Sequence, residues 1–176
     1  MTHPDAAHPG PAVLSVLALT ALLACEGAAE SPPDPTPAAV KALAAGKLTE
    51  AFRGFDQGCK AGQGAACDAL GKLLAEGRGV TADPARAETL YRRACDAGTA
   101  AGCANLGAVV AGRGEDTAAA DLFRRACVDG DVAGCSNLGV MYGLGRGVTK
   151  DLDRAGFLAR WSCDGGDALA CSRVPK

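Results

Sequence analysis

Eight of the nine cysteines in this sequence form four pairs, each with seven residues between its members. The pairs are Cys59 and Cys67, Cys95 and Cys103, Cys127 and Cys135, and Cys163 and Cys171. Structural zinc sites usually place cysteines about two to four residues apart or combine them with histidines. Both histidines of this chain, His3 and His8, lie far from the pairs, near the N-terminus. The spacing therefore favours disulfides over a metal site, and we expect no metal and no other cofactor.

A disulfide within each pair requires the chain to turn back between its two cysteines. Residues eight positions apart in one helix lie about 12 Å from each other, whereas a disulfide needs Cα atoms within about 7 Å. A glycine, the residue that commonly ends a helix in the left-handed conformation, follows the first cysteine of each pair by three positions. These glycines are Gly62, Gly98, Gly130 and Gly166. Each pair is thus predicted to join the end of one helix to the start of the next.

Reduced, buried cysteines in a cytosolic protein are the alternative interpretation. Disulfides belong to oxidising compartments, and the sequence begins with a segment that looks like an export signal. Residues 12–25, AVLSVLALTALLAC, are apolar but shorter than the roughly 20 residues that a membrane span needs. We therefore expect a signal peptide at residues 1–24, although no Lys or Arg precedes the apolar stretch. A disordered tail leading into a buried helix is the alternative for this segment.

The residues that flank Cys25 resemble the lipobox of bacterial lipoproteins, in which the cysteine thiol receives a diacylglycerol. Leu22, Leu23 and Ala24 precede this cysteine, and the Pro-rich stretch EGAAESPPDPTP follows it. Such a polar stretch cannot bury a core. We expect lipidation of Cys25, a lipid-anchored linker at residues 25–37, and a location in the bacterial cell envelope, periplasmic or anchored to the outer membrane. The membrane would then be contacted through the lipid anchor only.

The cysteine pairs recur with periods of 36, 32 and 36 residues, which is the range of helix-turn-helix solenoid repeats. Four residues before the first cysteine of each pair stand Phe55, Tyr91, Phe123 and Ala159. A Leu-Gly step follows that cysteine by eleven and twelve residues, at Leu70-Gly71, Leu106-Gly107 and Leu138-Gly139. The leucine is expected to fill the core, and the glycine to mark the point where two helix backbones touch.

We therefore predict an all-α protein, a right-handed α-solenoid of about four disulfide-stapled helix-turn-helix repeats. The repeat domain covers residues 38–176, with units at about 38–66, 67–102, 103–134 and 135–171. Helices are expected at about 38–45, 49–60, 65–76, 84–96, 101–111, 116–128, 133–143, 152–164 and 168–172. The first unit is degenerate and suits a polar cap, and the third is four residues shorter than its neighbours.

Two stretches carry a resemblance to a known family. GRGVTADPARAETLYRRAC at residues 77–95 and GRGVTKDLDRAGFLARWSC at residues 145–163 are near copies of each other. Together with the preceding NLGVMY, they resemble the Sel1-like repeat, a variant of the tetratricopeptide repeat. The paired cysteines of each unit resemble the cysteine-rich secreted subset, the Helicobacter-type cysteine-rich proteins. That resemblance implies either a binding scaffold or a penicillin-binding, β-lactamase-type hydrolase, as some members of the subset are named.

The predicted mature chain contains no established catalytic motif that would support the hydrolase alternative. A serine β-lactamase needs S-x-x-K, and the four serines after residue 24 are followed three positions later by Asp34, Gly139, Gly165 and Pro175. A histidine-based zinc site is excluded because no histidine remains after residue 8. Cysteine nucleophiles are lost if all eight cysteines are paired. We therefore name no catalytic residue, and a weak β-lactamase-type hydrolase is kept only as the alternative function.

The favoured function is a scaffold that binds a protein or peptide through the concave face of the solenoid. The first helices of the pairs would present Lys72, Asn105, Asn137 and Val140 there, beside Asp68, Ala108 and Ser136. The two asparagines occupy matching repeat positions, where they would either bind a ligand backbone or merely cap and solvate their helices. The arginines of the second helices are expected to pair with Asp96, Asp129 and Asp164. A net charge of −2 and a pI near 5.7 argue against nucleic acid as a partner.

Overall fold

A computed structural model describes residues 36–172, which belong to one compact unit spanning Asp34–Lys176. These residues form nine α-helices and no strand. The helices are α1 (Thr36–Ala44), α2 (Leu48–Lys60), α3 (Gly64–Glu76), α4 (Pro84–Asp96), α5 (Ala100–Gly112), α6 (Asp116–Val128), α7 (Val132–Leu144), α8 (Leu152–Asp164) and α9 (Ala168–Cys171). The predicted signal peptide and Cys25 lie outside the described residues.

Local sequence signals set the ends of the helices. Asp83 caps α4 by accepting a hydrogen bond from the backbone N–H of Arg86 at 3.0 Å, and Pro84 occupies the first helical position, as its fixed φ favours. Asp151 caps α8 in the same way. After α4 the chain reverses at Gly98, whose φ of +82° is strained for any other residue. The predicted helix-turn-helix units therefore form as expected.

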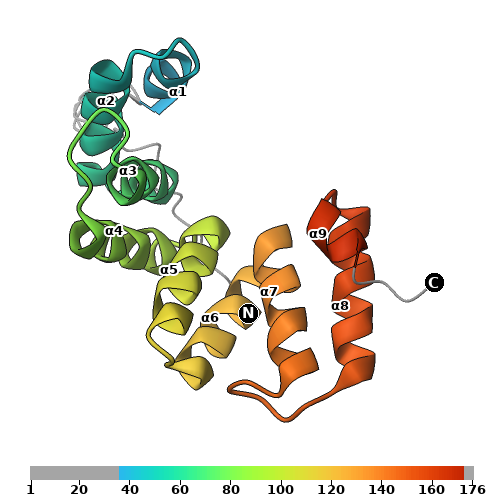
Figure 1. The fold of residues 1–176 in the computed structure, drawn as a ribbon. Helices are drawn as coiled ribbons and strands as arrows, with labels where there is room; N and C mark the ends of the chain where they lie inside the picture. The colour runs from blue at the N-terminus through green and yellow to red at the C-terminus, as the bar shows by residue number, and fades with distance from the viewer. Residues whose placement is uncertain (1–35, 173–176) are drawn as a thin grey trace, which may run out of the picture. The chain divides into compact units, whose positions relative to one another are not determined.

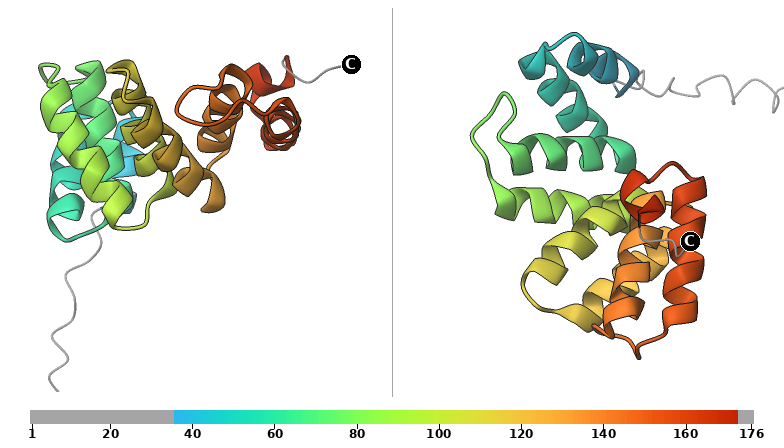
Figure 2. Two further views of the ribbon diagram at one scale, coloured as in Figure 1. Left: turned by 90° about the horizontal axis from the view of Figure 1, so that it is seen from below. Right: turned by 45° about the vertical axis from the view of Figure 1, so that its right-hand side comes forward.

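The helices stack in chain order as an α-solenoid, which confirms the predicted fold class (Figure 1). Each helix packs against the next along the chain, and the first helices of successive pairs also contact one another, α3 with α5 and α5 with α7. The second helices α4, α6 and α8 alternate with these first helices along the stack (Figure 2). We call the surface formed by α3, α5 and α7 the first-helix face.

Four disulfides join the second helix of each pair to the first helix of the following pair. The bonded pairs are Cys59–Cys67, Cys95–Cys103, Cys127–Cys135 and Cys163–Cys171, with Cα atoms 4.4 to 4.5 Å apart. They are the pairs predicted from the sequence. Because the chain turns back between α2 and α3, and again at each later junction, the two cysteines meet where one helix ends and the next begins.

The core is built from alanines and a few large side chains, among them the buried Phe55, Tyr91 and Phe123. The leucines of the Leu-Gly steps are buried as predicted, and a Cβ on Gly139 would lie 3.4 Å from the backbone carbonyl oxygen of Ala155, but the two earlier glycines differ from the prediction. A Cβ placed on Gly71 would lie 2.7 Å from the ring of Tyr91, and one on Gly107 would lie 2.8 Å from the ring of Phe123. These glycines therefore accommodate an aromatic ring from the paired helix rather than its backbone.

The short third unit is explained by its loop. A loop of seven residues, 77–83, connects α3 to α4, and a loop of the same length, 145–151, connects α7 to α8. Only residues 113–115 connect α5 to α6. All three of these first helices and their second helices contain thirteen residues. The deletion of four residues thus shortens a loop and leaves the helices intact.

Candidate functional site on the first-helix face

The first-helix face carries all four residues that the sequence predicted for partner binding. Lys72 lies on α3, Asn105 on α5, and Asn137 and Val140 on α7. Lys72 is exposed, whereas the other three are half-buried. The same face was expected to expose Asp68 and Ser136, and this part of the prediction is wrong. Asp68 is 6% exposed and Ser136 is 7% exposed.

Asp68 is the centre of a polar cluster that links two repeats. The amide Nδ2 of Asn105 donates a hydrogen bond to Oδ1 of Asp68 at 2.6 Å. The ammonium of Lys72 lies 2.7 Å from Oδ2 of the same carboxylate. A buried carboxylate requires such partners, because removing its charge from water is costly. Asn105 therefore has a structural role between α3 and α5, which neither interpretation drawn from the sequence included.

Asn137 differs from its counterpart Asn105. The residue of α5 that corresponds to Asp68 is Ala104, which offers no carboxylate. Within residues 36–172 the Asn137 side chain is half-buried and makes no hydrogen bond or ion pair. Its amide is therefore available to a ligand that approaches the first-helix face.

An apolar cavity of about 500 Å³ opens beside Val140, between α7 and α8 and against α9. Ten residues line it, and none is charged: Ser136, Gly139, Val140, Gly143, Leu144, Leu152, Ala155, Gly156, Ala159 and Ala170. Leu144 is 61% exposed and Leu152 is 67% exposed, so the rim of the cavity presents large apolar side chains to solvent. We call this cavity the α7–α8 pocket. Sequence reasoning had named three of its lining residues on α7, which are Ser136, Gly139 and Val140.

One residue of the pocket lining, Ala159, departs from the repeat pattern of the sequence. Phe55, Tyr91 and Phe123 are aromatic at the position four residues before the first cysteine, and Ala159 alone is small. Opposite this alanine α8 packs directly on Gly139, because a Cβ there would lie 3.2 Å from Cβ of Leu158 and 3.4 Å from the carbonyl oxygen of Ala155. This departure was visible in the repeat register, but its consequence depends on how the ring packs on the glycine, which only the structure reveals.

A second cavity of about 510 Å³ lies between α6, α7 and α8, and is lined by Val128, Tyr142 and Phe157 among others. Its lining carries charges of both signs, from Arg124, Arg154 and Asp153. The Arg154 guanidinium donates a hydrogen bond to the Tyr142 hydroxyl at 3.3 Å and lies 5.4 Å from the ring centroid. This hydrogen bond lowers the pKa of Tyr142. The carboxylates of Asp121 and Asp151 already pair with the two arginines.

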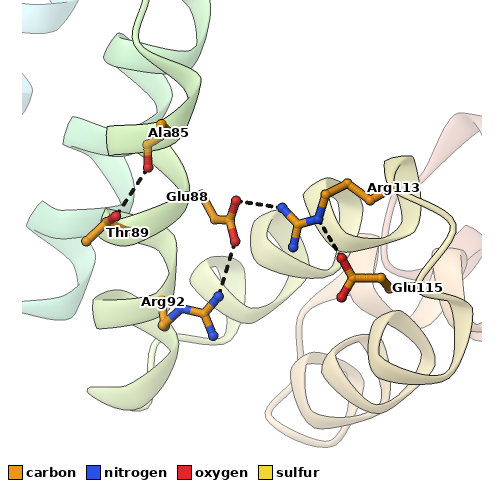
Figure 3. A network of polar contacts seen from close by, with 6 residues as sticks. All are labelled: Ala85, Glu88, Thr89, Arg92, Arg113 and Glu115. Carbon is orange, nitrogen blue, oxygen red and sulfur yellow. Dashed lines mark hydrogen bonds and ion pairs between the residues drawn. The ribbon is translucent and has the colours of Figure 1, made fainter.

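A charged network joins α4 to the loop that follows α5 (Figure 3). Glu88 accepts hydrogen bonds from Arg92 at 3.1 Å and from Arg113 at 2.6 Å, and Arg113 also donates to Glu115 at 2.6 Å. The hydrogen bond from Arg113 is the main reason that the pKa of Glu88 is lowered. The network thus fastens the second helix of one pair to the loop of the next.

The expected ladder between second-helix arginines and Asp96, Asp129 and Asp164 is wrong. Arg92 pairs with Glu88 and Arg124 with Asp121, both within one helical turn. Arg93 and Arg125 instead donate to backbone carbonyls, those of Cys59 and Cys95. A carbonyl at a helix end lacks an intrahelical donor, so it competes well for a nearby guanidinium.

Two further features were searched for in the part of the chain that the structure describes. No group of three or more His, Cys, Asp or Glu side chains there could hold a metal ion. Every helix in the same region is too short or too polar to cross a bilayer.

The comparisons with known proteins agree with this architecture. The Sel1 repeat family matches residues 64–99 and 132–167, which are the pairs α3–α4 and α7–α8 with their following turns. A protective antigen of uropathogenic Escherichia coli that displays an SLR fold shares 26% identity over 77% of this chain, with a TM-score of 0.70. A Sel1 repeat protein from Oxalobacter formigenes shares 29% identity over 69%, with a TM-score of 0.62.

This chain spans 31% of the length of the first of these proteins and 51% of the second. The cysteine-rich protein B of Helicobacter pylori aligns over 78% of the chain and 90% of its own length at 20% identity, with a TM-score of 0.34, which is too low for any inference. Among curated proteins, none matches this chain. The family matches, the two similar structures and the stacked helix pairs together show that the chain is similar to Sel1-repeat proteins and that residues 64–99 and 132–167 match this repeat.

Proposed function

We propose that this protein is a binding scaffold that holds a protein or peptide segment on its first-helix face. The observation that supports this most directly is the half-buried Asn137, which has no partner within the described residues and follows Ser136 of the pocket lining on α7. An unpaired amide can donate to and accept from a peptide backbone. A half-buried polar group next to an apolar cavity is the usual composition of a binding site.

The neighbouring Asp68 cluster supports the same proposal in a different way. Because Asn105 and Lys72 both bind Asp68, three polar side chains on α3 and α5 are held in fixed positions. Fixed side chains lose little conformational entropy when a ligand binds. The exposed ammonium of Lys72 can in addition attract an acidic group of the partner.

The experiment is selection of displayed peptides on the full chain, followed by binding measurements on one substitution at a time. Asn137→Arg removes the free amide and adds bulk, so it should weaken selected peptides by about 2 kcal/mol or more. Ala97→Arg, at the exposed turn between α4 and α5, is the matched control and should leave binding unchanged. Peptides that lose affinity with Ala97→Arg and keep it with Asn137→Arg would place the binding surface elsewhere.

Asn105 is unsuitable for this test, because its replacement would also leave Asp68 without a hydrogen-bond donor. Stability and binding would then change together. Asn137 separates the two effects, since within the described residues it makes no bond that its replacement would break.

We propose that the scaffold works in the bacterial cell envelope, attached through a lipid on Cys25. Four disulfides support an oxidising compartment, and the lipobox-like residues before Cys25 support the anchor. A lipid anchor of more than one acyl chain binds membranes stably. Metabolic labelling with a fatty acid should mark the wild-type chain and fail on Cys25→Ser. Label that persists in Cys25→Ser, or a wild type that takes none, would exclude this anchor.

A further inference from the structure

The cavity of about 510 Å³ between α6, α7 and α8, which we call the α6–α8 cavity, adjoins a cavity of about 370 Å³ beside the loop that connects α7 to α8. Arg124, Tyr142 and Arg154 line both cavities, so these three residues form the boundary between them. Apolar side chains make up most of the lining of the α6–α8 cavity. Three cations and one acidic group line the smaller cavity, namely Arg124, Lys150, Arg154 and Asp151.

The first junction of the stack shows how an arginine at the position of Arg154 is paired there. Aligning α6, α7 and α8 with α2, α3 and α4 on their cysteines pairs Arg154 with Arg86, and Arg124 with Asp56. The carboxylate of Asp56 lies 3.8 Å from the guanidinium of Arg86, so a carboxylate on one second helix faces an arginine on the next. In the α6–α8 cavity a second arginine, Arg124, takes the place of that carboxylate.

Two arginines therefore converge on one hydroxyl group. The Arg154 guanidinium donates a hydrogen bond to the Tyr142 hydroxyl at 3.3 Å. Hydrogen bonds from Arg154 and, to a smaller extent, from Arg124 lower the pKa of Tyr142. The hydrogen bond to Tyr142 raises the pKa of Arg154, while the nearby charge of Arg124 opposes this rise. An anion placed between the two guanidinium groups would remove their repulsion, and the Tyr142 hydroxyl can donate its own proton to that anion.

The carboxylates that already contact the two arginines do not replace the one that is missing. Asp121 bonds Nη1 of Arg124, and Asp151 lies 3.2 Å from Nε of Arg154. Each of these pairs is formed within one turn of chain by a largely exposed arginine, where an ion pair contributes little. A guanidinium has five N–H donors, so both arginines retain donors for a further carboxylate. Within residues 36–172, Lys150 makes no ion pair or hydrogen bond.

The apolar part of the cavity also distinguishes this junction. Val128 is 80% exposed and Phe157 is 61% exposed, although both are large apolar side chains. The equivalent residues of the two earlier junctions are polar or charged, and they are exposed although further helix pairs follow them: Lys60, Thr89, Asp96 and Asp121. This surface therefore stays open where the stack continues. Among the three junctions between second helices in the described part of the chain, this one alone is apolar there.

We propose that the α6–α8 cavity binds a small organic acid with a compact apolar body. The carboxylate of the acid lies between Arg124 and Arg154, where α2–α4 has a carboxylate of its own, and the apolar body lies on Val128 and Phe157. Guanidinium groups bind carboxylates through paired, charge-assisted hydrogen bonds, and both cavities have volumes typical of small-molecule sites. The proposal goes beyond the scaffold function, since this site needs neither Asn137 nor a peptide.

The test uses 3-phenylpropionate as a probe for the full chain labelled on its methyl groups. Titration should shift the NMR signals of Val128, Leu138 and Leu158 and saturate with a dissociation constant of about 1 mM. The matched amide, 3-phenylpropionamide, has the same shape without the charge and should bind at least about tenfold more weakly. Acetate has the charge without the apolar body and should also bind at least about tenfold more weakly. Equal affinity for the acid and its amide, or shifts spread over other methyl groups, would overturn the proposal.

Arg124→Asp should abolish these shifts, because it restores the carboxylate that faces an arginine in α2–α4. Arg92→Asp makes the same change at the matching position of α4, outside the cavity, and should leave the shifts unchanged. Phe157→Thr introduces the residue that α4 has at this position, and should weaken binding at least about threefold because apolar contact is lost. Full affinity in both Arg124→Asp and Phe157→Thr would show that the probe binds elsewhere and would overturn the proposal.

A free acid and the carboxyl terminus of a protein present the same carboxylate, and N-acetylphenylalanine distinguishes these two sources. This compound is 3-phenylpropionate with the peptide group that precedes a carboxyl terminus. It should bind no more tightly than 3-phenylpropionate, since any added hydrogen bond replaces one to water. Binding that is at least about tenfold tighter would assign the cavity to a protein carboxyl terminus and overturn the proposal of a small acid.

Discussion

The guanidinium of Arg93 donates a hydrogen bond to the backbone carbonyl of Cys59, with 2.8 Å between Nη2 and O. The bond connects α4 to the end of α2, beside the disulfide that joins α2 to α3. Arg125 makes the same contact with Cys95 one repeat later. In α8 the equivalent position holds Trp161, which is 39% exposed. Successive second helices are thus tied together by arginine in the centre of the stack.

Replacing Arg93 by alanine should lower the free energy of unfolding by about 1 kcal/mol, because the carbonyl of Cys59 loses the charged donor and keeps the backbone N–H of Gly62. Chemical denaturation of the oxidised chain measures the change. Arg92→Ala is the matched control. Arg92 contacts Glu88 on an exposed surface, so its loss should stay within about 0.5 kcal/mol. Equal losses of unfolding free energy for the two substitutions would show that the hydrogen bond from Arg93 to the carbonyl of Cys59 stabilises the fold no more than an exposed ion pair does.

The disulfide Cys95–Cys103 should contribute roughly 2–3 kcal/mol, the loop-entropy value for so short a loop. Both cysteines are almost fully buried, with exposures of 1% and 0%. The double substitution Cys95→Ser, Cys103→Ser should therefore reduce the free energy of unfolding by at least that amount.

Peptide mapping without reduction should recover the four local pairs in the wild type, and a crossed pair such as Cys67 with Cys95 would contradict the stacking order.

Gly147→Ala should destabilise the protein by more than about 1 kcal/mol. The residue has a φ of +66°, and an added Cβ would lie 2.2 Å from the carbonyl oxygen of Asp116, so strain and a backbone clash combine. Gly112→Ala provides the contrast, because that helical glycine has open space around its Cβ position and alanine favours helix. The melting temperature should therefore fall for Gly147→Ala and rise for Gly112→Ala. A Gly147→Ala variant with an unchanged melting temperature would refute the close contact between the repeats.

The two tyrosines should titrate far apart. Burial, with the nearby Asp68 charge, raises the pKa of Tyr91 to about 12 from 10.0, whereas the hydrogen bond from Arg154 lowers the pKa of Tyr142. A tyrosine with a raised folded-state pKa stabilises the fold fully below its unfolded value, so this contribution is lost as the pH rises from 10 toward 12. Phenolate absorbance of Tyr142→Phe isolates Tyr91; titration near 10 in the folded variant would contradict its burial.

Purified protein should turn over nitrocefin no faster than buffer. The serines after residue 24 lack a lysine three residues on, and the eight cysteines of the repeats are all bonded. Ser162 is buried, and its hydroxyl donates to the carbonyl of Val132. A preparation free of host β-lactamase is the necessary control, since traces of an enzyme with kcat/KM of about 10⁸ M⁻¹s⁻¹ would mimic activity. Turnover that disappears when one serine is replaced would establish the hydrolase alternative.

Most of the fold could be predicted from the sequence because its signals are local and repeated. Residues 84–96 and 152–164 were expected as helices and are helices with those bounds. Proline, the aspartate caps and the turn glycines fix such bounds over a few residues. The repeat register then supplied the cysteine pairing, since a helix reversal brings residues eight positions apart together.

The side chains of the first-helix face were predicted less well, because their partners come from other repeats. Asp68 looked exposed on its own helix, yet Asn105 binds it from a position 37 residues away. Arg93 looked like one of a row of surface charges, yet it reaches the carbonyl of Cys59. Helical periodicity describes one helix at a time, and it cannot indicate which neighbour shields a given side chain or which carbonyl competes for a guanidinium.

The short reach of the disulfides has a consequence for how the chain acquires them. The two cysteines of each disulfide are eight positions apart in sequence. When the chain emerges from a ribosome or a translocation channel, the two thiols of a pair therefore emerge almost together. An oxidant outside the channel can therefore oxidise one complete pair of thiols before the next cysteine emerges. Correct bonding then follows from the order of emergence, and the chain has little need of an enzyme that reshuffles mistaken pairs.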